Sequence, residues 1–233
     1  MKKNIKIAQI LLIPFLLIGI VSCEKDNYEA PSSSLVGSLV DKQTGNTVPQ
    51  QTINGGILRL FQTDLSDNAI AITSYFRSDG TFENKMLFDG NYKVVADGPF
   101  FYDDTVSVKI NKVTNQDIQV RPFLYVTAEL ESTTATSAKV KVTTAFGPGN
   151  TKQKIARVGV LAGTTNSVDI NFFSKRELTN TEQITDKEIL ETVYSYELKD
   201  LKPKTTYYIR GAARTINTGS YYNYAPILTI TTD

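Results

Sequence analysis

Short apolar segments that alternate with polar residues limit this chain to a β fold. The alternation is clearest over residues 105–110 and 117–120. Successive side chains of a strand point to opposite faces, so this pattern is typical of a strand that buries one face. Turn residues such as Asp89-Gly90 and Ser78-Asp79-Gly80 stand between the segments. Short strands separated by such turns predict a β-sandwich or a β-barrel.

The segments form two sets that meet near Pro122, a residue that cannot donate a ladder hydrogen bond. We predict strands at residues 35–40, 57–61, 81–82, 92–95, 105–110, 117–120, 124–130, 138–144, 156–161, 194–198, 207–213 and 227–231. The charged stretch 174–190 is expected to be a long connection with a short helical turn. The sequence therefore predicts an all-β protein of two consecutive β-sandwich domains, residues 35–122 and 123–233.

The first 22 residues have the pattern of a lipoprotein signal peptide. Three lysines precede an apolar run over residues 10–21, which is too short to span a membrane stably and contains Pro14. The run ends in Ser22-Cys23, so we expect cleavage before Cys23 and acylation of its thiol. The alternatives are cleavage without acylation and a retained anchor. Residues 23–34 are polar and small, and predict a flexible tether.

Composition excludes several kinds of function. Without the leader, 211 residues remain, with 22 basic and 24 acidic side chains. This balance offers no basic excess for phosphates, so we expect no nucleic-acid partner. With its one cysteine acylated, the mature chain has no disulfide.

The chain contains no histidine. The absence of histidine and of a free cysteine excludes His-dependent nucleophilic catalysis and His/Cys zinc sites. A glycosidase that uses two carboxylates stays open, although no pattern points to one. We expect no enzyme activity, no cofactor and no metal. The pairs Asp103/Asp104 and Asp64/Asp67 could suggest a calcium site, but without a further ligand pattern they are interpreted as solvated turn residues.

The first set of strands carries a glycine-rich pattern. Gly37-x-x-x-Asp41 precedes Thr44-Gly45, and Asp79-Gly80-x-Phe82 and Gly90-x-Tyr92 follow. This pattern resembles the prealbumin-like sandwich that also occurs as the regulatory domain of carboxypeptidases. The resemblance implies glycines at tight connections and inward-facing Phe82 and Tyr92.

The second set carries Leu201-x-Pro203-x-Thr205-x-Tyr207. This spacing is similar to the tyrosine corner of fibronectin type III domains. The resemblance implies that the Tyr207 hydroxyl reaches back to a main-chain group near the preceding turn. The mature chain lacks the core tryptophan that is usual in such domains.

The start of the mature chain, Cys23-Glu24-Lys25-Asp26-Asn27-Tyr28, with the first module after it, resembles a family of Bacteroidetes lipoproteins without an assigned function. Genes of that family lie in polysaccharide utilisation loci, beside an outer-membrane transporter and its binding lipoprotein. The resemblance implies an outer-membrane location at the cell surface, since acidic residues near the lipidated cysteine accompany export.

Two aromatic clusters are candidates for stacking on sugar rings. Tyr221, Tyr222 and Tyr224 belong to the expected loop before the last strand, and end loops of sandwiches commonly carry recognition. At least one of these rings is expected to be exposed, although covering the sandwich edge is the favoured alternative. Phe100, Phe101 and Tyr102 form the second cluster, for which core packing is favoured.

These observations predict a surface lipoprotein that takes part in glycan binding and uptake. The alternative is an interaction protein that docks on an outer-membrane transporter complex without contacting sugar. That alternative predicts exposed apolar surface.

Overall fold

The computed structural model describes residues 29–66, 68–150 and 153–233. The predicted signal peptide, Cys23 and the first half of the predicted tether lie outside these residues, and the last two tether residues belong to the first strand instead. Pro31–Asp233 forms one compact unit. Within the described ranges, no helix has the length and apolar character needed to cross a membrane.

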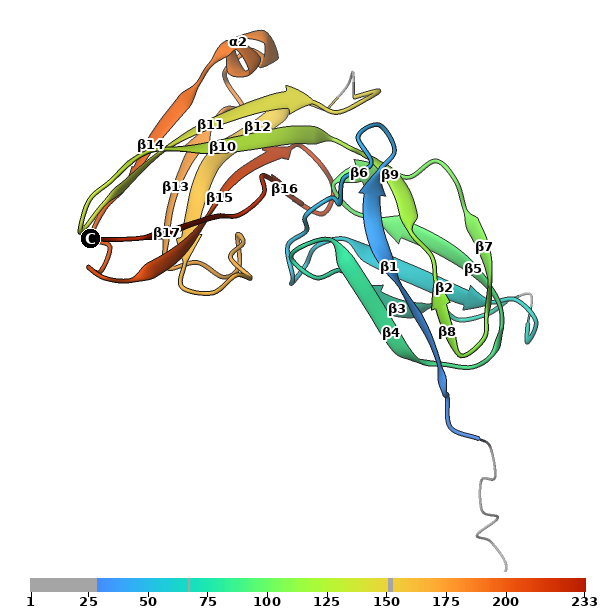
Figure 1. The fold of residues 1–233 in the computed structure, drawn as a ribbon. Coiled ribbons are helices and arrows are strands. Elements are labelled where there is room, and N and C mark those ends of the chain that lie inside the picture. Colours follow the sequence, from blue (N-terminus) through green and yellow to red (C-terminus); the bar gives the residue numbers. More distant parts are fainter. Residues whose placement is uncertain (1–28, 67, 151–152) are drawn as a thin grey trace, which may run out of the picture. The chain divides into compact units, whose positions relative to one another are not determined.

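Residues 33–122, called the N-terminal half below, form two sheets (Figure 1). One has the order β4-β1-β9-β6, with β8 beside β1, and the other has the order β3-β2-β5-β7. The strands are β1 (Ser33–Asp41), β2 (Ile57–Gln62), β3 (Ile72–Tyr75), β4 (Thr81–Leu87), β5 (Gly90–Asp97), β6 (Phe100–Phe101), β7 (Val106–Ile110), β8 (Val113–Asn115) and β9 (Ile118–Pro122).

Alternation along the strands builds the core of this half. In β2, Leu58 and Leu60 are fully buried, whereas the residues between and beside them are partly exposed. Strand β5 pairs with β2 and buries Tyr92 and Val94 in the same way. These side chains pack with Leu35 and other apolar residues of β1, β4, β7 and β9 in one cluster. The two sheets therefore enclose a single apolar layer.

Residues 124–231, the C-terminal half, also form two sheets (Figure 1). Their orders are β10-β11-β14 and β13-β12-β15-β16, with β17 beside β15. The elements are β10 (Leu124–Thr133), β11 (Ala138–Phe146), β12 (Ile155–Gly163), β13 (Lys175–Asn180), α2 (Asp186–Glu191), β14 (Tyr194–Leu198), β15 (Thr206–Thr215), β16 (Asn223–Tyr224) and β17 (Leu228–Thr231).

A second apolar cluster lies between the sheets of the C-terminal half. Val140 and Val142 of β11 face Val158 and Val160 of β12, and all four are fully buried. At the edge of this core, the Tyr207 hydroxyl accepts a hydrogen bond from the main-chain nitrogen of Lys202 at 3.0 Å. This is the contact that a tyrosine corner makes. The all-β sandwich class expected from the sequence is confirmed.

The stretch 174–190 differs in part from its prediction. It contains the strand β13, which pairs with β12 and was not predicted, whereas the helix α2 supplies the expected helical turn. Thr185 caps this helix by accepting a hydrogen bond from the Glu188 nitrogen. The short strand β16, which pairs with β15, was not predicted either.

The two cores are separate, since one contains residues 35–120 and the other residues 123–230. The compact unit nevertheless covers both halves. The predicted domain limits, 35–122 and 123–233, therefore stay a prediction.

Candidate functional site

Arg210 of β15 connects the two halves through main-chain carbonyl groups. Its guanidinium donates to the Ser78 oxygen of the N-terminal half at 2.8 Å and to the Gln50 oxygen at 3.4 Å. It also donates to the oxygens of Val168 and Ala225 in its own half, both at 3.2 Å. The side chain is only 1% exposed, so these carbonyls replace the water that a surface arginine would bind.

The charge of Arg210 persists at neutral pH. Burial lowers the pKa of Arg210 to about 10, while the nearby Tyr224 ring and the carboxylates of Asp169 and Asp79 oppose this shift. The guanidinium carbon lies 4.4 Å from the centroid of the Tyr224 ring. Burial raises the pKa of Tyr224, so this hydroxyl stays protonated. Arg210 and Tyr224 therefore form a cation–π pair out of contact with solvent.

Asp169, in the loop between β12 and β13, makes a second connection. One carboxylate oxygen accepts hydrogen bonds from the nitrogen of Thr52 at 2.7 Å and from its hydroxyl at 2.8 Å. The other oxygen accepts from the nitrogens of Asn171 and Phe172 within the same loop. Asp169 is fully buried. It therefore fixes the loop and joins it to the N-terminal half.

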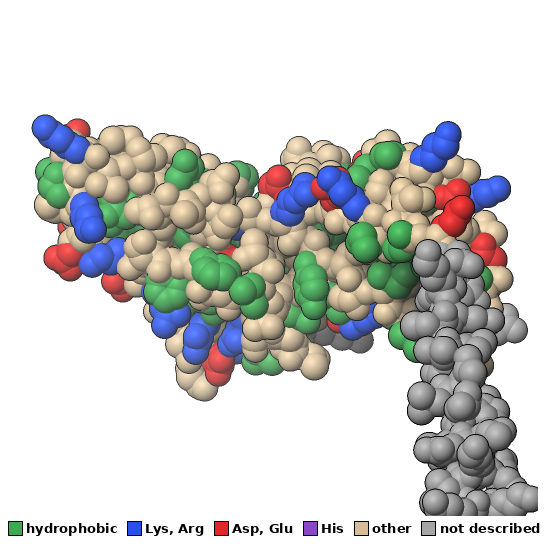
Figure 2. Space-filling view, turned by 90° about the horizontal axis from the view of Figure 1, so that it is seen from below, with side chains coloured by type: hydrophobic (Ala, Val, Ile, Leu, Met, Phe, Trp, Pro, Cys, Tyr) green, Lys and Arg blue, Asp and Glu red, His purple; other side chains and the backbone are tan. Residues whose placement is uncertain are grey.

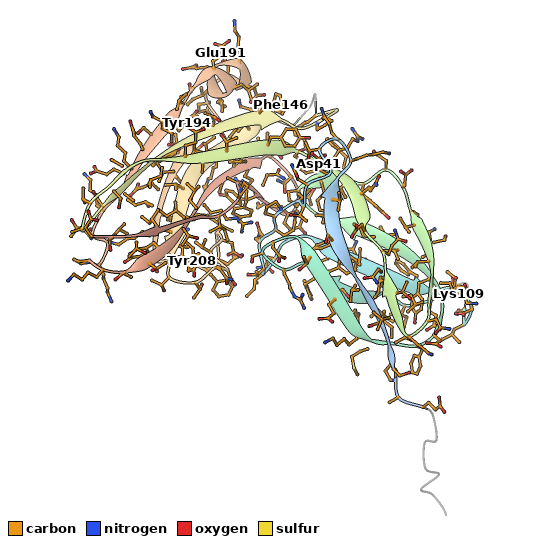
Figure 3. All side chains as sticks on the ribbon, in the orientation of Figure 1. Asp41, Lys109, Phe146, Glu191, Tyr194 and Tyr208 are labelled. Atoms are coloured by element: carbon orange, nitrogen blue, oxygen red, sulfur yellow. The ribbon has the colours of Figure 1, made fainter. Side chains whose placement is uncertain are left out.

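A third connection involves Asp41 at the end of β1 (Figure 3). Its carboxylate accepts hydrogen bonds from the hydroxyls of Thr44 and of Tyr125 in β10, at 2.7 and 2.8 Å. Burial acts to raise the pKa of Asp41, but these bonds and one from the Gln43 nitrogen outweigh it and lower the pKa. Burial and the bond to Asp41 raise the pKa of Tyr125 to about 12. Asp41 therefore stays ionised at neutral pH.

The three predicted tyrosines have different environments. Tyr222 and Tyr224 are 3% and 5% exposed, and they pack in a small cluster on the face of the β12–β15 sheet opposite the core. The Tyr222 nitrogen donates to the Gln51 side chain at 3.1 Å. These two rings offer no face to a ligand, which corrects their predicted role as ligand-binding residues. The third residue, Tyr221, is partly exposed.

Tyr221 lines an open hollow of about 660 Å³. Asn217 closes the loop around it by exchanging hydrogen bonds with the nitrogen and oxygen of Tyr221, at 2.8 and 3.0 Å. The ring packs on Gly219, where a Cβ atom would lie 2.1 Å from it. The hollow is also lined by Asp97, Phe123, Gln153 and Ile216. It therefore combines an aromatic ring with amide and carboxylate groups.

The second aromatic cluster is packed into the protein. Phe100 is buried in the core of the N-terminal half. The Phe101 ring lies 4.7 Å from that of Phe123. The Tyr102 hydroxyl donates to the Val94 oxygen at 2.9 Å and accepts from the Val106 nitrogen at 3.2 Å. Buried Phe100 offers no face to a ligand, which corrects its predicted role, whereas the ligand role of the partly exposed Phe101 and Tyr102 stays a prediction.

The structure nevertheless brings the two aromatic segments together. The side chain of Asn223, between Tyr222 and Tyr224, donates to the Pro99 oxygen at 3.0 Å and accepts from the Leu124 nitrogen. This contact holds residues 98–99 beside the loop that carries Tyr221. Gly98 accordingly lines the same hollow.

The aspartates that could suggest a calcium site either contact basic side chains or lie outside the described residues. Asp103 makes two hydrogen bonds with the Arg121 guanidinium, at 2.6 and 2.8 Å. Asp104 lies 3.7 Å from the Lys42 ammonium group. Asp67 lies outside the described residues. Among the residues that the structure describes, no cluster of three acidic or sulfur ligands is suited to a metal ion.

The fold of this chain is similar to that of several solved all-β structures. A protein of the DUF3823 family from Bacteroides uniformis shares 21% identity and a TM-score of 0.76, over 87% of this chain and 100% of that one. A second protein from that organism, described as a "putative carbohydrate binding protein", shares 22% identity and a TM-score of 0.72, over 86% and 99% of the two chains. A DUF3823 protein from Parabacteroides merdae shares 20% identity and a TM-score of 0.68, over 88% and 100%.

The family match concerns the N-terminal half. Residues 33–121 match the model described as "Protein of unknown function (DUF3823) N-terminal domain". No curated protein matches the sequence.

Proposed function

We propose that this protein is a non-enzymatic, surface-anchored lipoprotein that binds glycans through the hollow at Tyr221. The hollow carries the proposal, because it is open to solvent and places a partly exposed ring beside Asp97, Asn217 and Gln153. An aromatic ring can stack on the apolar face of a sugar, while a few polar groups fix its orientation. The similar protein from Bacteroides uniformis that is described as carbohydrate binding supports the same function.

Binding, rather than catalysis, fits the side chains that this chain contains. It has no histidine, and its single cysteine belongs to the predicted lipobox. We also propose that the whole chain belongs to a Bacteroidetes lipoprotein family of polysaccharide utilisation loci. Its N-terminal half is then prealbumin-like and its C-terminal half fibronectin-like. In such a system, a lipoprotein beside a transporter can bind weakly, since anchoring on one surface raises the effective concentration.

The hollow can be tested with Tyr221→Ala. We expect soluble protein from Glu24 onward to be retarded in native gels that contain the recognised polysaccharide, and the variant to bind about tenfold more weakly. Loss of one aromatic contact of about 1.5 kcal/mol has this effect. Affinity electrophoresis against plant, host and microbial glycans measures it. Tyr75→Ala removes a tyrosine that is 61% exposed on β3 and is the matched control.

Two outcomes would contradict this site. If the wild type and Tyr221→Ala are retarded equally by a bound glycan, the hollow is not where that glycan binds. If no glycan retards the wild type, docking on a transporter complex becomes the better explanation.

One observation favours docking on a transporter complex. Ile53 and Phe172 are 48% and 47% exposed, and a hydrogen bond from Asn171 to the Ile53 oxygen joins their loops. Figure 2 shows hydrophobic side chains at the surface, with lysines and arginines close by.

The lipid anchor can be tested with Cys23→Ser in the full chain. We expect cells fed an alkyne-bearing fatty acid to label the wild-type protein and not the variant, since serine has no thiol to acylate. Gel fluorescence after coupling to a dye measures the label. Protease treatment of intact cells then reports surface exposure. Equal labelling of both proteins, or of neither, would contradict acylation at Cys23.

A further inference from the structure

Arginines gather on one face of the β13-β12-β15-β16 sheet. In β12, Val158 and Val160 point into the core. Because side chains alternate along a strand, Arg157, the residue before Val158, points to the opposite face. In β15, Ile209 and Ala213 point into the core, and Arg210 and Arg214 point away from it. Arg210 is occupied at the connection between the halves. Arg157 and Arg214 do not take part in that connection.

Arg157 and Arg214 lie directly opposite each other in the pairing of β12 with β15. Like charges at such positions repel each other unless an anion lies between them. The nearest carboxylate oxygen to Arg214 is that of Glu182, at 3.9 Å from Nη2. The Nε atom of Arg214 is buried and has no hydrogen-bond partner in the described part of the chain. A buried donor without a partner costs about 1–3 kcal/mol. The Arg214 guanidinium carbon lies 5.6 Å from the centroid of the Tyr222 ring.

The edge strand β13 continues the same face. Asn180 pairs with Arg157, Leu178 with Gly159, and Arg176 with Leu161 of β12. Arg176 is exposed and Arg157 is partly exposed, so both side chains contact solvent. Glu177, the residue next to Arg176, points to the other face and does not neutralise it.

An aromatic side chain lies at the far end of this row. The Arg176 guanidinium is 4.5 Å from the centroid of the Phe173 ring, and Phe173 is 38% exposed. Arg176 and Asn180 are four residues apart, which corresponds to about 13 Å along a strand. We call this row the arginine strip, defined by Phe173, Arg176, Leu178, Asn180, Arg157 and Arg214.

We propose that the arginine strip binds an anionic polysaccharide, such as a polyuronate, at a site separate from the hollow at Tyr221. Guanidinium groups bind carboxylate and sulfate oxygens in bidentate geometry. Arg157 pairs with Asn180, so Arg157 and Arg176 are about 13 Å apart along the strands. Two cationic side chains at this distance match a polymer with repeated charges better than a single small anion. Phe173 supplies a ring for a sugar face. This inference rests on the proposed function, since it assigns a second kind of glycan to the protein.

The test compares two triple variants with the same change in charge. Arg157→Gln/Arg176→Gln/Arg214→Gln alters the strip, and Arg59→Gln/Arg77→Gln/Lys85→Gln alters exposed cations of the N-terminal half. We expect polygalacturonate to retard the wild type and the control triple equally, and the strip triple to bind at least tenfold more weakly. Binding should weaken as sodium chloride rises, because the contacts are ionic. Isothermal titration at two salt concentrations provides the affinities.

A further variant and one further ligand, polyglutamate, make the result decisive. Arg157→Gln/Arg176→Gln leaves the partly buried Arg214 intact, and a Tm equal to that of the wild type shows that a binding defect in this double variant is not caused by misfolding. Equal losses in the strip and control triples would overturn the proposal, since only net charge would then matter. Polyglutamate binding as tightly as polygalacturonate, and lost in the strip triple, would overturn it in favour of an acidic protein partner.

The same titrations separate this inference from the proposed function. Binding of a neutral glycan that depends on Tyr221, without any binding of polygalacturonate, overturns the arginine strip and leaves the proposed function standing. Absence of binding to every glycan overturns both.

Discussion

Replacing Arg210 with methionine is expected to lower the free energy of unfolding by about 3–5 kcal/mol. Methionine fills a similar space but donates no hydrogen bond, so carbonyls of Gln50, Ser78, Val168 and Ala225 lose their shared donor. Each unsatisfied buried group costs about 1–3 kcal/mol, and local relaxation offsets part of the sum. In a protein of this length, the expected fall in Tm is about 10 °C.

Thermal and urea unfolding of the soluble protein from Glu24 onward measure this effect. Arg77→Met is the matched control, because Arg77 has 60% of its side chain exposed and pairs with Glu83 at the surface. We expect this control to change stability by less than about 0.5 kcal/mol. Arg210→Lys should lie between the two, since one ammonium group cannot reach carbonyls on all sides. An Arg210→Met protein as stable as the control would show that the connection contributes nothing to stability.

Replacing Gly37 with alanine is expected to destabilise the protein by about 3 kcal/mol, the upper part of the usual range for overpacking. Gly37 lies in β1, and a Cβ atom there would be 2.0 Å from the main-chain oxygen of Gln116 and 3.0 Å from the Phe82 ring. The oxygen belongs to the backbone and cannot rotate away. The connection between β8 and β9 must therefore shift, and the pairing of Gln116 with Val36 is strained.

Gly45→Ala separates this steric effect from the conformational preference of glycine. Gly45 has a φ of 74° but no atom within 4 Å of its Cβ position. Its replacement should cost about 1–2 kcal/mol, the penalty of the left-handed region alone. Urea denaturation of both variants gives the comparison. If Gly45→Ala proves as harmful as Gly37→Ala, close packing at Gly37 is not the cause.

The alternation in the sequence predicts those strands that bury one face against a core. It finds β2, β5 and β12 within two residues of their limits, because Leu58, Tyr92 and Val158 belong to such faces. It does not find β13, an edge strand in which Leu178 is the single apolar residue. A strand at a sheet edge needs only main-chain hydrogen bonds on one side, so its side chains carry little pattern.

The candidate sites depend on contacts that spacing in the sequence does not reveal. Asp169 bonds to Thr52 across 117 residues, and Arg210 bonds to Ser78 across 132. The sequence offers one signal for Arg210, a charged residue inside the otherwise apolar strand 209–213. Strand alternation indicates that some of the three tyrosines are buried, and the structure leaves Tyr221 as the partly exposed one.

The pairing of β1 has a consequence for the order in which the chain folds. This strand lies at the start of the described fold, yet Leu39 pairs with Ile118 of β9 and Leu35 with Thr114 of β8. Loop closure over such a separation is slow, and it cannot begin before both partners exist. A chain that is synthesised or translocated from its N-terminus therefore keeps one edge of β1 unpaired until about residue 120 has emerged. During that interval, the unpaired main-chain groups of this edge can pair with the wrong strand.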